Sequence, residues 1–223
     1  MKIKIKNLSP VVIFAYNRLE HLKKTIESLK KCKLSKNTNL IIYLDNYNKE
    51  SDKQRVINIK NFSHKIKGFK KITLIQRKKN LGMSKNIILG VSQTLKKFKK
   101  GIFLEDDMIL DKYFLEYMNF YLEFYRNNKK VSSIHGYSYP TNKALPEYFF
   151  LKGADCWGWA TWSRAWKLYS NNSEYLLKKI NNKGLVKSFN FNNTYNYSSM
   201  LKKNLKKKNS SWAKNWYSSC FLK

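Results

Sequence analysis

Residues Pro10–Leu29 read PVVIFAYNRLEHLKKTIESL, and this stretch decides the fold class. Its first part, Pro10–Tyr16, is a nearly continuous apolar run rich in β-branched and aromatic residues, which is typical of a buried strand in a parallel sheet. The next apolar side chains recur at spacings of three and four and predict an amphipathic helix, with Asn17 at the expected N-cap. The residues that carry this spacing are Leu19, Leu22, Ile26 and Leu29.

The alternation of strand and helix continues along the chain. It predicts further strands at Leu40–Leu44, Ile72–Gln76, Ile102–Leu104 and Val131–His135, and further helices at Met83–Phe98 and Phe114–Tyr125. Because such alternation implies right-handed crossovers, we expect an α/β fold with a mostly parallel sheet flanked by helices. From about Pro140 the periodicity fades and the chain becomes aromatic, irregular and basic.

The composition suits one basic domain. The chain has 223 residues, 43% of them hydrophobic, and its 45 Lys and Arg against 14 Asp and Glu give a net charge of +31. Such a surface attracts polyanions, so nucleic acid, an anionic membrane and lipid-linked saccharides are candidate partners. An AT-rich coding sequence produces the same excess of Lys and Asn, so the charge does not choose among these partners.

Neither cysteine chemistry nor a membrane-spanning segment is indicated. Cys32, Cys156 and Cys220 form no CxxC pair, which argues against a zinc site or a disulfide framework and favours a reducing compartment. Met1–Pro10 lacks the apolar core of a secretion signal, and no segment reaches the roughly 18 uncharged apolar residues of a membrane span. We therefore expect a cytoplasmic protein whose contact with an anionic membrane is peripheral, at its inner face.

Polar residues follow four of the predicted strands. In an open parallel sheet, ligands bind beyond the carboxyl ends of the strands, so these residues are expected at one rim. Arg18 and Lys85 each stand near the start of a helix, where free N–H groups favour phosphate, although a basic residue more often faces solvent. Asp45 ends a buried strand and is suited to accept hydrogen bonds from a base or ribose; the alternative is a turn-forming Asp.

Three consecutive carboxylates, Glu105, Asp106 and Asp107, follow the fourth strand. They repel one another unless a cation or hydrogen-bond donors lie beside them. A Mg²⁺ or Mn²⁺ ion suits oxygen ligands and leaves positions for diphosphate oxygens. The alternative is an exposed acidic turn that caps the helix expected near Asp111.

Five stretches in this order resemble glycosyltransferase family 2 and its GT-A relatives, particularly the branch similar to the Golgi N-acetylglucosaminyltransferase that starts complex N-glycans. The resemblance implies a GT-A (Rossmann-like) fold, a UDP-sugar or similar donor, and Mn²⁺ or Mg²⁺. With the fading periodicity, it predicts a single domain over 1–223, with a nucleotide-sugar-binding half at 1–139 and an acceptor-side half at 140–223. The stretches are Pro10–Leu29, Ile41–Asn46 (IIYLDN), Lys79–Gly90 (KNLGMSKNIILG), Phe103–Ile109 (FLEDDMI) and Cys156–Trp166 (CWGWATWSRAW).

Carried over residue by residue, the resemblance implies a role for each polar position. Arg18 is expected near the diphosphate, Asp45 near uracil or another base, and Lys85 within the donor pocket. In the acidic triplet, Asp107 is expected to bind the metal and Asp106 the ribose.

On the sugar side, the resemblance implies that Glu105 faces the donor sugar. Trp157 and Trp159 are expected to shape the acceptor and donor-sugar side, because aromatic faces stack on the C–H faces of sugars. Trp162 and Trp166 lie four residues apart, which favours a hydrophobic core helix for these two.

The resemblance to the family is weakest at the catalytic base. Inverting transfer needs a carboxylate that takes the proton from the acceptor hydroxyl. The downstream stretch Ser210–Ala213 offers serine where an acid is expected, so Asp155 is the candidate base, with Glu174 behind it. The family usually continues past this stretch, so we expect a shortened acceptor half. Residues Asn181–Ser210 are expected either to bind acceptor or to form a polar, basic and partly disordered tail.

The leading functional hypothesis is a metal-dependent, inverting hexosyl- or N-acetylhexosaminyltransferase. It moves a sugar from a nucleotide-sugar, expected to be a UDP-sugar, to a glycan or lipid-linked saccharide in cell-surface glycan biosynthesis. Two alternatives stay open: a remnant that binds nucleotide-sugar without turnover, and a basic nucleic-acid-binding protein. The last alternative is disfavoured because it leaves the acidic triplet unexplained.

Overall fold

The computed structural model describes residues 7–205 and 211–223. Its centre is a six-stranded sheet in the order β3-β2-β1-β4-β6-β5, in which β1 to β4 run parallel and β6 runs antiparallel to both neighbours. The predicted α/β fold with a mostly parallel sheet is confirmed. The strands are β1 (Val11–Ala15), β2 (Asn39–Leu44), β3 (Lys71–Gln76), β4 (Lys100–Glu105), β5 (Ser133–His135) and β6 (Trp159–Trp162).

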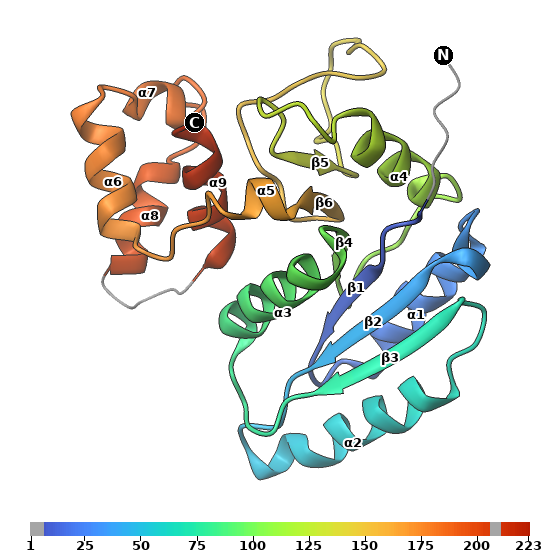
Figure 1. The fold of residues 1–223 in the computed structure, drawn as a ribbon. Helices are drawn as coiled ribbons and strands as arrows, with labels where there is room; N and C mark the ends of the chain where they lie inside the picture. The colour runs from blue at the N-terminus through green and yellow to red at the C-terminus, as the bar shows by residue number, and fades with distance from the viewer. Residues whose placement is uncertain (1–6, 206–210) are drawn as a thin grey trace.

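Helices cover both faces of the sheet. Figure 1 shows α3 on one face of the parallel strands and α1 and α2 on the other, while α6 to α9 gather beyond α3 and α5. The helices of the first part are α1 (Leu19–Lys31), η1 (Ser35–Asn37, a 3₁₀ turn), α2 (Glu50–Lys65), α3 (Met83–Phe98) and α4 (Phe114–Phe124). Those of the second part are α5 (Ser163–Trp166), α6 (Ser173–Asn182), α7 (Val186–Phe189), α8 (Tyr197–Leu205) and α9 (Trp212–Phe221).

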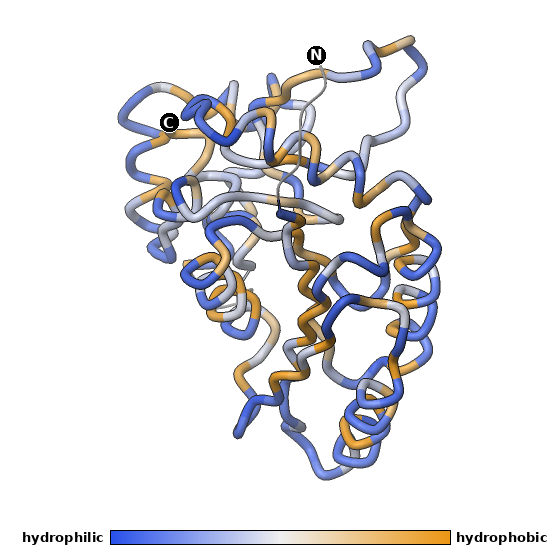
Figure 2. Tube along the Cα trace, turned by 45° about the vertical axis from the view of Figure 1, so that its right-hand side comes forward, coloured by the Kyte–Doolittle hydropathy of each residue, from blue (hydrophilic) through white to orange (hydrophobic). Residues whose placement is uncertain are grey.

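The first strand and helix follow the predicted pattern. All five residues of β1 are buried, and α1 buries the face that carries Leu22, Ile26 and Leu29. Figure 2 shows hydrophobic residues along the central strands and hydrophilic residues over the outer helices. Asn17 is not the N-cap of α1: the residue before the helix is Arg18, and the Asn17 amide instead donates to Asp52 on α2 at 2.9 Å.

The second part of the chain departs from the prediction. Trp162 is buried as expected, but it lies in strand β6 rather than in a helix, while Trp166 is buried at the end of α5. Because β6 pairs with β4, the sheet extends past residue 140 and is not confined to residues 1–139.

The segment that was expected to be irregular contains helices. Between 181 and 205 the chain forms α7 and α8 rather than a featureless tail, while residues 206–210 lie outside the described part. None of the helices in the described ranges is long and apolar enough to cross a membrane.

Candidate active site

Three strands of the parallel sheet end side by side at one rim. β1 pairs with β2 up to Ala15 and Leu44, and Phe14 pairs with Glu105, the last residue of β4. Parallel strands place the loops after their carboxyl ends at the same edge. The polar residues that follow these three ends are Arg18, Asp45, Asp106 and Asp107.

Asp45 is buried at this rim, with only 3% of its surface exposed. Its Oδ1 accepts hydrogen bonds from the backbone N–H groups of Asn46 at 3.0 Å and Leu81 at 2.9 Å. Among the described residues, hydrogen bonds to the Asp45 carboxylate use only Oδ1. Oδ2 accepts no hydrogen bond within the described ranges.

The loop after β3 joins Asp45 to the start of α3. Asn80 Nδ2 donates to the Asn46 carbonyl at 2.6 Å, which holds this loop against the end of β2. Gly82 precedes α3 with φ of +73°, a conformation that favours glycine. Lys85 lies exposed in the first turn of α3, which contains no acidic residue. The loop between β3 and α3 therefore lies between Asp45 and Lys85, the two residues expected on the donor side.

Arg18 joins the two aspartates that follow β4. Its Nη2 donates to Asp106 Oδ1, and its Nη1 lies 3.0 Å from Asp107 Oδ2. Asp106 is 3% exposed, and burial raises its pKa although the charge of Arg18 acts in the opposite direction. Asp107 is the exposed member of the pair. The guanidinium therefore neutralises a turn that would otherwise hold unpaired negative charge.

Thr25 fixes the backbone of the acidic turn, a role that was not predicted. Its hydroxyl donates to the Asp106 carbonyl at 2.8 Å and accepts from the Met108 N–H at 3.0 Å. The Thr25 side chain is fully buried on α1. A single hydroxyl thus ties the turn after β4 to the first helix.

Glu105 has a pKa near neutrality. Burial, followed by the negative charges of Asp107 and Asp106, raises its pKa to about 7, while Arg18 opposes the shift. At neutral pH such a carboxyl can either donate or accept a hydrogen bond, which suits contact with a sugar hydroxyl.

The antiparallel strand β6 brings a second carboxylate toward Glu105. β6 pairs with β4 at Trp159 and Phe103, so the chain just before β6 runs alongside the end of β4. Gly158 (φ +67°) lies there, and a Cβ built on it would be 3.6 Å from the Leu104 side chain. Asp155 lies three residues before Gly158, in the loop that leads into β6 beside the end of β4.

Cys156 directly follows Asp155 and is half-buried. Its pKa is raised to about 12, first by burial and then by the negative charges of Asp155 and Glu105. The raised pKa keeps Cys156 protonated, so this thiol is not an activated nucleophile.

Asp155 is held by three neighbours. Its Oδ1 accepts from the Trp157 N–H at 2.7 Å, its Oδ2 accepts from the Tyr139 hydroxyl at 2.9 Å, and its own N–H donates to His135 Nε2 at 3.3 Å. Burial lowers the pKa of His135, which keeps the imidazole neutral and able to accept this bond. Neither Tyr139 nor His135 was predicted as a site residue, since their contact with Asp155 arises only from the loop between β5 and β6.

The two tryptophans expected at the sugar side occupy different environments. Trp157 is 45% exposed, and its ring lies 5.1 Å from that of Tyr137 and 5.8 Å from that of Tyr139. Trp159 is only 2% exposed and packs among Phe103 and other core rings, so it has no face open to a sugar. Its assignment to the site is corrected: side chains alternate across β6, and Trp159 points into the core.

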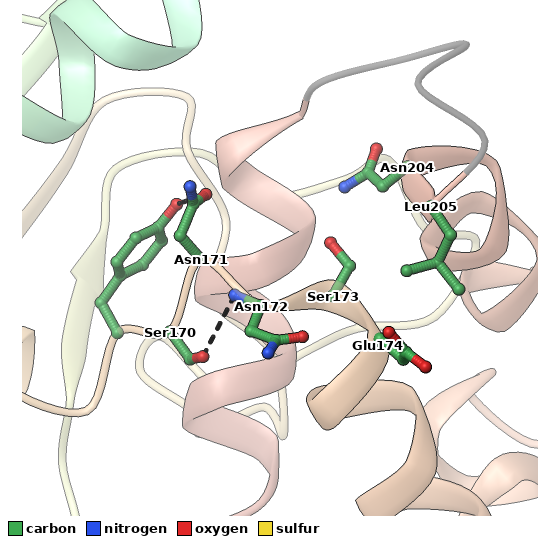
Figure 3. Close-up of a pocket in the computed structure, with 8 residues that line it drawn as sticks. Ser170, Asn171, Asn172, Ser173, Glu174, Asn204 and Leu205 are labelled. Carbon is green, nitrogen blue, oxygen red and sulfur yellow. Dashed lines mark hydrogen bonds between the residues drawn. The ribbon is translucent and has the colours of Figure 1, made fainter.

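Glu174, the second candidate base, lies in the first turn of α6 and lines a shallow pocket at the C-terminal helices (Figure 3). The pocket wall includes polar side chains of the loop between α5 and α6, such as Asn171, together with Ser173 at the start of α6 and Asn204 on α8. Neither Glu105 nor Asp155 lines it. Glu174 thus lies among the C-terminal helices, whereas Asp155 lies in the loop that leads into β6.

The side chains at the acidic turn suit a hard divalent cation. Asp107 presents carboxylate oxygens, the ligand type that Mg²⁺ and Mn²⁺ prefer, and its side chain is 34% exposed. Within the described ranges, no group of three or more His, Cys, Asp or Glu side chains surrounds a common point. An ion at Asp107 therefore needs further ligands from water or from a bound diphosphate.

Comparisons with known proteins identify one sequence family and several solved structures to which this chain is similar. The sequence profile of glycosyl transferase family 2 matches residues 11–186, whereas no curated protein matches the chain. S. aureus TarS 1–349 in complex with UDP is 15% identical over 60% of this chain and 38% of its own, with a TM-score of 0.42. Mannosyltransferase PcManGT from Pyrobaculum calidifontis, in complex with GDP-Man and Mn²⁺, is 6% identical over 59% of this chain and 36% of its own, with a TM-score of 0.40.

The chain thus corresponds to little more than a third of each of these solved chains, and TM-scores this low carry no argument about its donor or metal. The family match is different, because it covers more than half of the chain and includes every residue of the rim from Arg18 to Trp157. The six-stranded, mostly parallel sheet is consistent with the GT-A fold. The chain therefore belongs to glycosyl transferase family 2.

Proposed function

We propose that this glycosyltransferase moves a sugar from a UDP-sugar to a hydroxyl of a glycan or lipid-linked saccharide, with inversion at the anomeric carbon. A hexosyl or an N-acetylhexosaminyl group is the proposed cargo. The observation that carries the proposal is the antiparallel pairing of β6 with β4, which places the loop that holds Asp155 beside the end of β4, where Glu105 lies. A solvated acidic turn that only caps a helix has no need of this second carboxylate.

The nucleotide is proposed to lie along the rim. The open oxygen of Asp45 accepts from the base, and Asp106 lies near the ribose. Arg18, which is 41% exposed at its side chain, and Lys85 reach the diphosphate. Two arrangements support this proposal: the ordered loop between Asp45 and Lys85, and the guanidinium of Arg18 at the exposed end of the turn.

The transfer step uses Asp155 as the proposed base. Its carboxylate takes the proton of the acceptor hydroxyl while the hydroxyl oxygen forms a bond to the anomeric carbon. The bond from that carbon to the diphosphate oxygen breaks, and the electron pair leaves with UDP. Glu105 is proposed to hold a hydroxyl of the donor sugar, and the exposed ring of Trp157 to stack on the acceptor sugar.

Asp107 is the proposed ligand of a divalent cation. When bound, the ion neutralises negative charge on the leaving diphosphate. Arg18 contacts the same carboxylate, so it adds a second positive charge at this position. Mn²⁺ and Mg²⁺ both suit oxygen ligands of this kind.

UDP release from a set of UDP-sugars, with a glycolipid extract as acceptor, tests the proposed base. Asp155→Asn is expected to lower kcat by about 10²–10⁴-fold and to leave the affinity for UDP unchanged. The matched control is Asp111→Asn, because Asp111 is exposed and resembles Asp155 in its local hydrogen bond. Each of these two carboxylates accepts a hydrogen bond, at 2.7 Å, from the backbone N–H of the residue two positions later.

Three results would contradict this account. An Asp155→Asn protein with the same kcat as the control removes Asp155 from the reaction. Wild-type protein that binds UDP but gives no product with any donor indicates a donor-binding remnant. Wild-type protein that binds single-stranded nucleic acid and ignores UDP indicates a nucleic-acid-binding protein instead.

A further inference from the structure

The loop between β5 and β6 exposes an apolar tip. Every residue from Gly136 to Lys152 is exposed, and five of these residues have large apolar side chains close together in sequence. Phe150 is 71% exposed and Leu151 57% exposed. We name the five residues the tip cluster: Leu145, Tyr148, Phe149, Phe150 and Leu151.

The tip cluster is anchored on α4. The ring of Tyr148 lies 5.2 Å from that of Tyr121, and the ring of Phe150 lies 5.7 Å from that of Tyr125. Phe124, next to Tyr125, is itself 51% exposed and adds to the same apolar surface. Figure 1 shows this loop beyond β5 and α4, at the opposite end of the molecule from α2. The exposed rings therefore form a fixed surface patch, larger than a single stray side chain would give.

Positive charges surround the tip cluster. Lys143 and Lys152 flank it in sequence, and Lys129 and Lys130 follow the end of α4. All four lysines are exposed, and in the described part of the chain none of them takes part in an ion pair. The loop from 136 to 152 contains one acidic residue, Glu147, whose carboxylate accepts a hydrogen bond from Tyr148. The patch is therefore both apolar and basic.

We infer that the tip cluster binds an anionic lipid surface. Aromatic and aliphatic side chains enter the interface between headgroups and acyl chains, and lysines around them contact anionic headgroups. A second copy of this chain is a poor partner because each copy carries a net charge of +31. An anionic bilayer complements both the charge and the apolar rings.

This surface also gives the active site an orientation. Three residues separate Leu151 at the tip from Asp155, so a membrane-bound tip places the proposed base close to the bilayer. The substrate class that fits this position is a saccharide linked to a lipid rather than a free glycan. That consequence rests on the proposed function, whereas the binding of lipid by the tip cluster does not.

Cosedimentation with lipid vesicles tests the inference. Vesicles of phosphatidylcholine alone are compared with vesicles of equal parts phosphatidylcholine and phosphatidylglycerol. Wild-type protein is expected to sediment with the anionic vesicles only, and Phe149→Ser/Phe150→Ser is expected to bind them at least about tenfold more weakly. The matched control is Ile57→Ser/Leu89→Ser, which removes two exposed apolar side chains from α2 and α3.

If circular dichroism shows that the double variant does not fold, the single variant Phe150→Ser replaces it. Phe150 has the most exposed ring of the tip cluster. The inference is overturned if wild-type protein stays in the supernatant, or if the tip variant binds like the control, since charge alone then drives binding. It is also overturned if sedimentation velocity shows a dimer that the tip variant abolishes. UDP release is measured in a separate assay. A protein that binds vesicles but releases no UDP therefore contradicts the proposed transferase function, but not the inferred lipid binding by the tip cluster.

Discussion

Arg18 Nη1 lies 3.0 Å from Asp107 Oδ2, so a guanidinium contacts the carboxylate that we propose as the metal ligand. The two cations compete for one side chain when a metal binds. A bound diphosphate relieves the competition, because it offers Arg18 a second anion. Arg18 is thus proposed to stabilise the acidic turn before substrate arrives and the diphosphate afterwards.

Removing the guanidinium of Arg18 should make the stability of the fold more responsive to a divalent metal. Arg18→Gln leaves the buried carboxylate of Asp106 without its charged partner, and we expect a loss of about 1–3 kcal/mol in the free energy of unfolding. Mn²⁺ should raise the melting temperature of Arg18→Gln by more than it raises that of the wild type. Arg55→Gln, which removes an exposed ion pair of 3.8 Å, is the control and should have little effect. Equal responses of Arg18→Gln and wild type to Mn²⁺ would contradict competition at Asp107.

The hydroxyl of Thr25 should affect both stability and donor binding. Thr25→Val keeps the shape of the side chain but removes both hydrogen bonds to the acidic turn, at a cost of about 2–3 kcal/mol. Because the turn then loses its fixed position, KM for the donor should rise more than kcat falls. Thr25→Ser retains the hydroxyl and should restore KM. A Thr25→Val protein with unchanged KM would show that the hydroxyl serves stability alone.

Glu105 should make the fold less stable as the pH rises. Its pKa is about 7 in the folded chain against an ordinary value of 4.5, so the stability from its protonated form is complete below pH 4.5 and is lost as the pH rises through 7. Glu105→Gln cannot ionise and should melt several degrees higher than wild type above neutral pH, with the difference closing in mild acid. Melting curves recorded across this pH range test the prediction. A difference in melting temperature that does not change with pH would show that Glu105 has its ordinary pKa.

The neighbouring tryptophans should give opposite phenotypes. Trp159→Ala removes a ring that is 2% exposed and should cost about 3–5 kcal/mol of stability. Trp157→Ala removes a ring that is 45% exposed, so it should leave the melting temperature nearly unchanged and raise KM for the acceptor. Chemical unfolding and steady-state kinetics on both variants separate the two roles. A Trp159→Ala protein with the same free energy of unfolding as wild type would contradict the core assignment.

Most strands and helices of the first part could be predicted because each of these shows its apolar periodicity within its own short stretch of sequence. The helix predicted at Met83–Phe98 begins and ends at those residues, and the four parallel strands lie within two residues of their predicted bounds. α2 was not predicted, since its buried residues are few: Val56, Ile59 and Ser63.

The other features depend on contacts that no local pattern encodes. Strand β6 has all four residues buried, so it shows no alternation that separates a strand from a helix. Its antiparallel pairing with β4 sets Trp159 beside Phe103 in the core and places the loop that holds Asp155 beside the end of β4. The contact between Thr25 and Asp106 joins positions 81 residues apart and required the folded chain.

Calorimetric titration of UDP into the protein, with and without Mn²⁺, decides whether Asp107 holds a divalent cation against a nucleotide diphosphate. Mn²⁺ is expected to tighten UDP binding by about tenfold or more in wild type, and by far less in Asp107→Asn. Equal UDP affinity with and without Mn²⁺ in wild type, or equal enhancement in both proteins, would contradict this role of Asp107.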